Sequence, residues 1–96
     1  MQRKSYRRRR PLPSEVPLLI EVADSSLGDD RHVKGPLYAA AGIAEYWIVN
    51  LPGRCIEVHR APLDGRYTDV RIYGIGEGIS PLAFPDVTLQ VALLFE

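Results

Sequence analysis

The alternation of apolar and polar positions divides the chain into a strand, a helix and a later series of strands. Residues 18–23 are apolar except for Glu21. An apolar run of this length is typical of a strand that is covered on both faces, in the middle of a sheet. Several prolines precede the run, and because proline disfavours helix in the residue before it, the ordered fold is expected to begin near Val16.

A helix is predicted directly after this strand. The segment Ser26-Leu27-Gly28-Asp29 resembles a capping box, and Asp30 also suits the positive end of a helix. The helix is expected to reach about Ala41, where Gly42 would end it. Pro36 lies inside this range and removes one helical hydrogen bond, so we expect either a kink there or a later start of the regular helix.

After the helix, the hydrophobic pattern changes to a period of two. Alternation of this kind, broken by turn residues, is typical of antiparallel strands joined by short turns. The pattern predicts strands over residues 46–50, 55–60 and 67–73, with turns at Pro52-Gly53 and at Leu63-Asp64-Gly65-Arg66. Together these strands form a three-stranded meander. A further short strand is expected over residues 87–89.

Length and composition limit the class of protein. With 96 residues and 46% hydrophobic content, the chain forms one small globular domain. No apolar stretch reaches the roughly 20 residues that span a bilayer, and the N-terminus lacks the apolar segment of a signal peptide. A single cysteine, Cys55, excludes an internal disulfide, which fits a reducing compartment. We therefore expect a cytoplasmic protein that has no membrane partner.

The net charge of zero hides an uneven distribution. Six of the twelve positive charges lie in residues 1–10, so the remaining residues carry six positive and twelve negative charges, a net charge of minus six. Residues 1–15 are expected to form a basic, flexible arm. Such an arm can neutralise phosphates, which makes Arg7, Arg8, Arg9 and Arg10 candidate nucleic-acid contacts. The alternative is a solvated tail that binds nothing.

Glu21 is the first candidate for chemistry. A carboxylate on a buried strand costs several kcal/mol unless it binds a cation or hydrogen-bond donors. It is therefore either a functional group or a structural carboxylate with internal partners. Lys34 lies on the predicted helix, where it could instead form an exposed pair with Asp30, four residues earlier.

The other polar and aromatic candidates have simpler interpretations. Asp24, with Ser25 and Ser26, suits a turn and a helix cap. His32 is expected on the helix and His59 on the polar side of a strand, so a shared metal site is not predicted. The aromatic candidates are expected to pack in the core or at the sheet edge, and they are Tyr38, Tyr46 and Trp47.

An ordered set of short segments points to a known family. These segments are Leu19-Ile20-Glu21-Val22-Ala23-Asp24-Ser25-Ser26-Leu27, Asp30-Arg31 with Lys34 and Tyr38, Ala41-Gly42-Ile43, and Glu45-Tyr46-Trp47-Ile48-Val49-Asn50. The combination resembles the putative restriction endonuclease family that is greatly expanded in cyanobacteria, a branch of the PD-(D/E)xK nuclease superfamily. The resemblance runs from about Pro11 to the C-terminus and covers the later half of the family's domain. It identifies residues 16–96 as a partial restriction-endonuclease-like domain.

The resemblance implies an α/β (α+β) fold, in which a mixed β-sheet with a flanking helix forms a truncated restriction-endonuclease-like domain. It also implies an endonuclease that uses Mg²⁺ to hydrolyse DNA phosphodiesters and needs no small-molecule cofactor. Glu21 is then a catalytic residue and the metal ligand, since Mg²⁺ prefers carboxylate oxygens. The superfamily's lysine, usually two positions after the acid, is missing because that position is Ala23. The resemblance places it on the helix, as the catalytic Lys34.

The chain departs from the family in one important respect. The family's first aspartate lies in a Pro-Asp pair on an upstream strand, and no such pair precedes Glu21. Pro85-Asp86 comes in the wrong order and is taken as a coincidence. We therefore expect a weakly active or inactive nuclease. Strand 18–23 would also lack a neighbour, which favours a homo-oligomer. The alternative is a non-catalytic small sheet protein for DNA binding or protein dimerisation.

Overall fold

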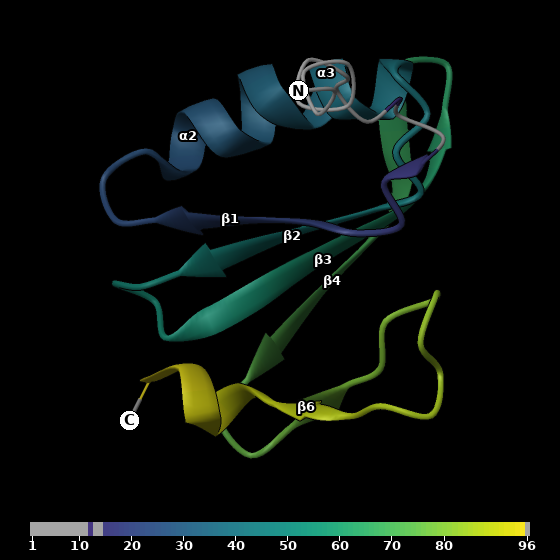
Figure 1. Ribbon diagram of the computed structural model, residues 1–96. Coiled ribbons are helices and arrows are strands. Elements are labelled where there is room, and N and C mark those ends of the chain that lie inside the picture. Colours follow the sequence, from purple (N-terminus) through teal and green to yellow (C-terminus); the bar gives the residue numbers. More distant parts are fainter. Residues whose placement is uncertain (1–11, 13–14, 96) are drawn as a thin grey trace, which may run out of the picture.

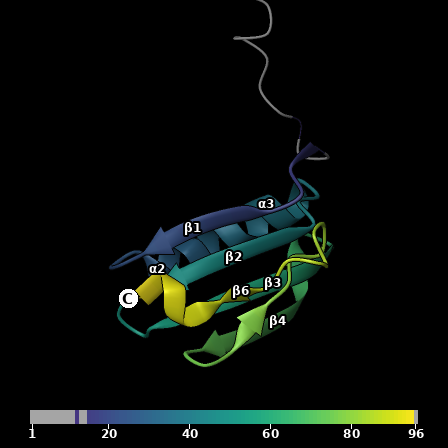
Figure 2. The same cartoon turned by 60° about the horizontal axis from the view of Figure 1, so that its bottom comes forward.

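The computed structural model describes residue 12 and residues 15–95. They form three layers, and the middle layer is a mixed sheet (Figure 1). The sheet has four strands in the order β1-β2-β3-β4. A helical segment covers one face, and the C-terminal residues cover the other (Figure 2). The covering elements are α2 (Leu27–Asp29), η2 (Asp30–Lys34) and α3 (Gly35–Ala40) on one face, and β5 (Gly78–Ile79), β6 (Leu89–Gln90) and η3 (Val91–Phe95) on the other.

The register of the sheet combines one parallel pair with an antiparallel meander. β1 (Leu19–Ala23) pairs in parallel with β2 (Glu45–Asn50). β2 then pairs antiparallel with β3 (Cys55–Leu63), and β3 pairs antiparallel with β4 (Arg66–Gly74). The predicted meander, and the mixed sheet with a flanking helix, are therefore confirmed.

The turn between β3 and β4 explains why this hairpin was predictable. Asp64 and Gly65 both have positive φ angles, 53° and 76°. A two-residue hairpin turn with both φ angles positive matches the right-handed twist of the strands, and Asp-Gly is a favoured pair for it. The expected short strand over residues 87–89 is found slightly later, as β6.

β1 does not lie in the middle of the sheet, and the prediction that it is covered on both faces is wrong. It is an edge strand, and Ile20 and Val22 are 47% and 62% exposed. The strand with both faces covered is β2, in which every residue is buried. The apolar composition of β1 is the same as that of a central strand, so composition alone could not separate the two positions.

The helical segment runs from Leu27 to Ala40, close to the predicted range, but its middle is π-helical. The N–H of Gly35 donates to the carbonyl of Asp30, five residues earlier. Pro36 follows directly, in the first turn of α3. At this position proline is tolerated, because no regular α-helical hydrogen bond requires its missing N–H. The helical segment thus accommodates Pro36 through a wider turn. No helix in the described residues is long and apolar enough to cross a membrane.

The predicted capping box does not form. Ser26 is the N-cap residue of α2, but its side chain makes no capping hydrogen bond. Its hydroxyl instead donates to Asp30 Oδ2 at 3.3 Å. A serine hydroxyl can hydrogen-bond either to the backbone of a helix terminus or to a nearby carboxylate, and here it donates to the buried carboxylate of Asp30.

Two apolar clusters hold the layers together, one on each face of the sheet. Tyr46 and Ile48 of β2 pack beneath the helical segment, with Ala39 among their neighbours. Trp47 and Val49 point the other way, against the C-terminal elements. The packing predicted for Tyr46 and Trp47 is confirmed, and it fixes the helical segment over the face that carries Glu21.

Candidate active site at the edge strand

Glu21 and Lys34, the two residues singled out from the sequence, lie in direct contact. Glu21 projects from β1 towards the helical segment and is 25% exposed. The Nζ of Lys34 donates to Oε1 at 2.9 Å, and the hydroxyl of Tyr38 donates to Oε2 at 3.0 Å. The strand therefore supplies the acid, and one side of the helical segment supplies both donors.

Asp30 is a second carboxylate in this cluster. Its Oδ1 lies 3.2 Å from Lys34 Nζ, so the ammonium group bridges two acids. The pair expected between Lys34 and Asp30 forms, but the prediction that it is exposed is wrong for Asp30, which is 0% exposed. The Lys34 contact is electrostatic rather than a well-directed hydrogen bond, since Oδ1 has no hydrogen-bond partner among the described residues. Asp30 thus fixes the position of Lys34 from inside the fold.

The charges of this cluster keep Lys34 protonated. Its hydrogen bond to Glu21, and then its close contact with the Asp30 carboxylate, raise the pKa of Lys34 well above its ordinary value. Burial, followed by the hydrogen bond to Glu21, also raises the pKa of Tyr38. At neutral pH the site therefore presents an ammonium group and a neutral phenol on opposite oxygens of one carboxylate.

One copy of the chain offers few donors to a resident Mg²⁺ here. Both oxygens of Glu21 are already hydrogen-bonded, and Asp30 is sealed from solvent. The described residues contain no group of three or more His, Cys, Asp and Glu side chains that could hold a metal ion. Mg²⁺ is usually held by one or two carboxylates together with water and substrate phosphates. One partly exposed carboxylate is at the lower limit of that range.

A second charged cluster lies on the other side of the helical segment. Arg31 donates from Nε to Glu57 Oε2 at 2.8 Å, and its Nη2 also bonds that oxygen. His59 Nε2 lies 3.3 Å from Glu57 Oε1. His59 does lie on the polar side of β3, beside Glu57, but this side is covered, since Glu57 and His59 are 3% and 8% exposed. Helix coverage of this face was not visible in the period-two pattern.

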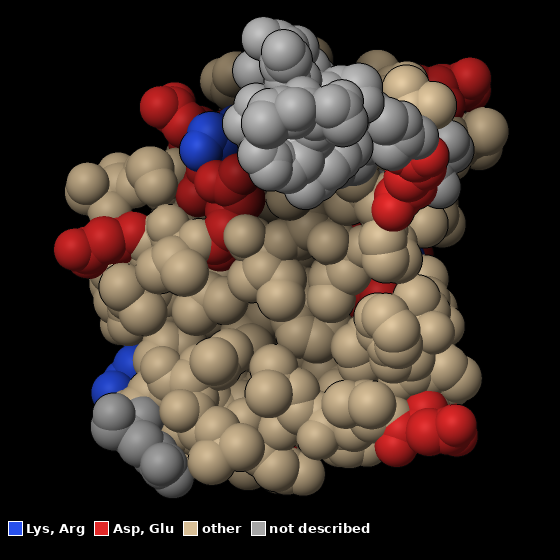
Figure 3. All heavy atoms as spheres, viewed as in Figure 1, with Lys and Arg blue, Asp and Glu red and all other residues tan. Residues whose placement is uncertain are grey.

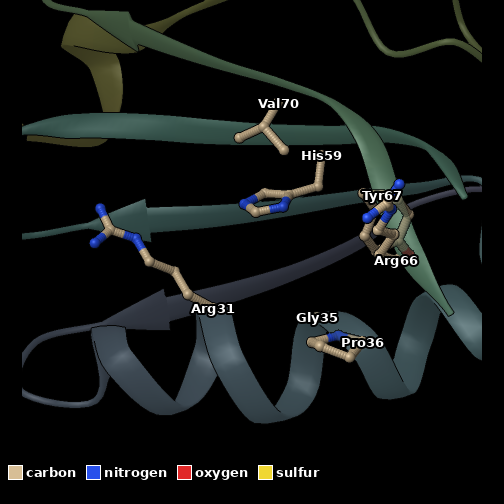
Figure 4. A pocket seen from close by; sticks show the side chains of 7 residues that line it. All are labelled: Arg31, Gly35, Pro36, His59, Arg66, Tyr67 and Val70. Carbon is tan, nitrogen blue, oxygen red and sulfur yellow. The ribbon is translucent and has the colours of Figure 1, made fainter.

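An open groove runs beside this second cluster, between the helical segment and β4 (Figure 4). His59 lies at its centre, with Arg31 towards one end and Arg66 towards the other. The wall of the groove is completed by Gly35, Pro36, Tyr67 and Val70. Because Arg31 is already paired with Glu57, Arg66 is the guanidinium group that this groove can offer to an anion.

The cluster around Glu21 contains two residues that the sequence reasoning did not assign to it. Tyr38 was expected only to pack, and Asp30 only to pair with Lys34 at the surface. Both lie four residues from Lys34, at the spacing that places side chains on one side of a helix. That spacing could have identified them. The arm residues Arg7, Arg8, Arg9 and Arg10 lie outside the described residues.

The family model described as "Putative restriction endonuclease" (Uma2) matches residues 2–92. The matched range includes both Glu21 and Lys34, as well as most of the basic N-terminal segment. The comparison with curated proteins gave no match.

Proposed function

Because the chain belongs to the putative restriction endonuclease family, we propose that its chemistry is the hydrolysis of DNA phosphodiesters at the Glu21 cluster. The observation that carries this proposal is the 2.9 Å contact between Lys34 Nζ and Glu21 Oε1. It joins a strand acid to a helix lysine at a partly exposed edge of the sheet. Two side chains 13 positions apart in the sequence thus meet where a DNA strand can reach them.

Lys34 has the clearest role in this proposal. Phosphodiester hydrolysis builds negative charge on the phosphate oxygens, and a fixed cation beside them stabilises that charge. Asp30 holds the ammonium in place from the buried side, at 3.2 Å. Lys34 is 41% exposed, so its charge remains open to a substrate. Tyr38 is a positioning residue that holds the second oxygen of Glu21.

A single copy of the chain is proposed to cleave slowly at most. Hydrolysis of this class draws on a divalent cation, which activates water and neutralises charge on the phosphate. Glu21 is the proposed ligand, but in one copy it offers only one accessible carboxylate, and Lys34 and Tyr38 compete for its oxygens. Substrate phosphates could supply further ligands, although the chain itself holds the ion weakly.

A plasmid cleavage assay in Mg²⁺ or Mn²⁺ tests this function. We expect slow, metal-dependent cleavage that falls about a hundredfold, or to the background, in Glu21→Ala and in Lys34→Ala. Asp86→Ala is the matched control, because Asp86 is an exposed carboxylate and is expected to have no role. Equal cleavage by all four proteins would show that a contaminant is responsible. No cleavage by any of them would show that the chain is not a nuclease.

The groove beside Arg66 favours a second candidate function, which is DNA binding without catalysis. Each Lys or Arg that contacts a phosphate steepens the salt dependence of affinity, by about 0.9 in the slope of log K against log[salt]. We expect Arg66→Ala to reduce the magnitude of this slope by about 0.9, the value of one phosphate contact. Deletion of residues 1–10 should reduce it further. Fluorescence anisotropy with a labelled duplex at several salt concentrations measures the slope. An unchanged slope in both variants would exclude these contacts.

A further inference from the structure

The two edges of the sheet differ in how they are protected. Edge strands of soluble proteins usually carry lysine, proline or other charged residues that prevent pairing with another chain. β4, at one edge, carries Arg66, Asp69 and Arg71, and the last two form an ion pair at 3.2 Å. β1, at the other edge, has Glu21 as its only charge, and this side chain turns towards the helical segment. Among the residues that the structure describes, none gives the β1 edge this usual protection.

The surface around the β1 edge is also apolar. Ile20 and Val22, which point away from the helical segment, are 47% and 62% exposed. Figure 3 shows this side of the molecule, where uncharged residues make up most of the described surface and charged side chains lie mainly towards the margins. Exposed apolar side chains on an open strand edge are a typical site of strand pairing between chains.

The backbone of β1 is arranged for such pairing. The carbonyl of Ala23 accepts a hydrogen bond from the N–H of Leu51, so the polar groups of Ala23 point towards β2. Because these groups alternate in direction along a strand, those of Glu21 also point towards β2. The N–H and C=O groups of Ile20 and Val22 then point outward, at the open edge.

We propose that two copies of the chain pair antiparallel through β1, about a two-fold axis at Glu21, and that the two Glu21 carboxylates form a divalent-cation site. This register overlaps the whole of β1, because Glu21 is its middle residue. It places Ile20 of each copy opposite Val22 of the other, where their outward groups bond each other. The two Glu21 residues become a non-hydrogen-bonded pair, with Cα atoms about 4.5 Å apart.

The charge of the paired site selects the ligand. In each copy, Glu21 and Asp30 carry two negative charges and Lys34 one positive charge, a net charge of minus one. Two copies bring together a net charge of minus two, which a divalent cation neutralises. Like charges placed directly opposite each other on two strands destabilise the pairing. A cation bound between the two Glu21 carboxylates removes this repulsion, so cation binding and dimerisation each favour the other. This inference rests on the proposed role of Glu21, and it supplies the second accessible carboxylate that one copy lacks.

The test combines mass measurement by light scattering with Mn²⁺ titration by electron paramagnetic resonance. We expect a mass of about twice 10.7 kDa and one Mn²⁺ per two chains. Val22→Lys should give a monomer that loses Mn²⁺ binding at least tenfold. Ile72→Lys on β4 is the matched control, because Ile72 is 61% exposed against 62% for Val22, and it should keep both properties. Circular dichroism checks that each variant is folded.

Four results would overturn this inference. A monomeric wild-type chain, or a dimer that Val22→Lys leaves intact, would exclude the β1 interface. A dimer that is lost when residues 1–10 are deleted would assign the pairing to the arm instead. A dimer whose Mn²⁺ binding survives Glu21→Gln would exclude the shared carboxylate site. None of these results depends on cleavage, so the inference and the nuclease function can fail separately.

Discussion

Replacing Glu45 by alanine is expected to lower the free energy of unfolding by about 3–5 kcal/mol, since it leaves the buried indole N–H of Trp47 and the largely buried guanidinium group of Arg60 without this acceptor. Glu45 is 0% exposed. Its carboxylate accepts hydrogen bonds from Trp47 Nε1 at 2.7 Å, from Arg60 Nε at 2.8 Å and from the N–H of Leu82 at 2.8 Å. These bonds join β2 to β3 and to the C-terminal layer. Urea unfolding followed by tryptophan fluorescence measures the loss.

Two further variants show whether this loss comes from the hydrogen-bond network. Glu45→Gln keeps the shape of the side chain and part of its accepting capacity, so it should lose less than Glu45→Ala. Asp86→Ala, at an exposed position, should change stability by no more than about 0.5 kcal/mol. An equal, small loss in all three variants would mean that Glu45 does not hold the layers together.

Glu57 gives the second largest expected effect, and this effect depends on pH. Burial by itself raises the pKa of Glu57, but the hydrogen bonds from Arg31 and His59 together outweigh it and hold the pKa below the ordinary value of 4.5. A carboxyl with a lowered folded-state pKa contributes stability above its unfolded-state pKa. That contribution is lost as the pH falls from about 4.5 through the lowered value.

We therefore expect Glu57→Gln to cost about 2 kcal/mol at pH 7, where the charged hydrogen bonds are lost. The cost stays moderate because the side chain of Arg31 is 40% exposed and can turn to water. The difference between wild type and variant should shrink as the pH falls below about 4.5. Urea unfolding at several pH values measures this difference. A difference that stays constant down to pH 3 would contradict the charged pairing.

The strands of the meander could be predicted because each carries a local signal. Alternating positions in β3 and β4, and the Asp64-Gly65 turn between them, depend on neighbours a few residues away. The position of β1 depends on which strands lie beside it, and its apolar residues suit a central or an edge strand equally. The π-helical turn before Pro36 was foreseen only as an irregularity, since proline shows where a helix must adjust but not how.

The candidate site was only partly predictable. Glu21 and Lys34 were chosen from the family resemblance and from the cost of a carboxylate on an apolar strand, and the fold brings them to 2.9 Å. Tyr38 joins them because the helical segment crosses above β1. Its spacing of four residues from Lys34 places both side chains on one side of a helix, but it does not show that this side faces Glu21. The burial of Glu57 and His59 has the same cause, since the alternation of polar and apolar positions in β3 does not reveal that the helical segment covers the polar face.

The central proposal is that Glu21, held at the edge of the sheet with Lys34 beside it, binds a divalent cation. The most direct test is to titrate Mn²⁺ into ¹⁵N-labelled protein and to map which amide signals broaden first. The claim predicts early broadening in β1 and near Lys34 and Tyr38, and its loss in Glu21→Gln. Broadening centred elsewhere, for example near Asp86, or an unchanged pattern in Glu21→Gln, would contradict it.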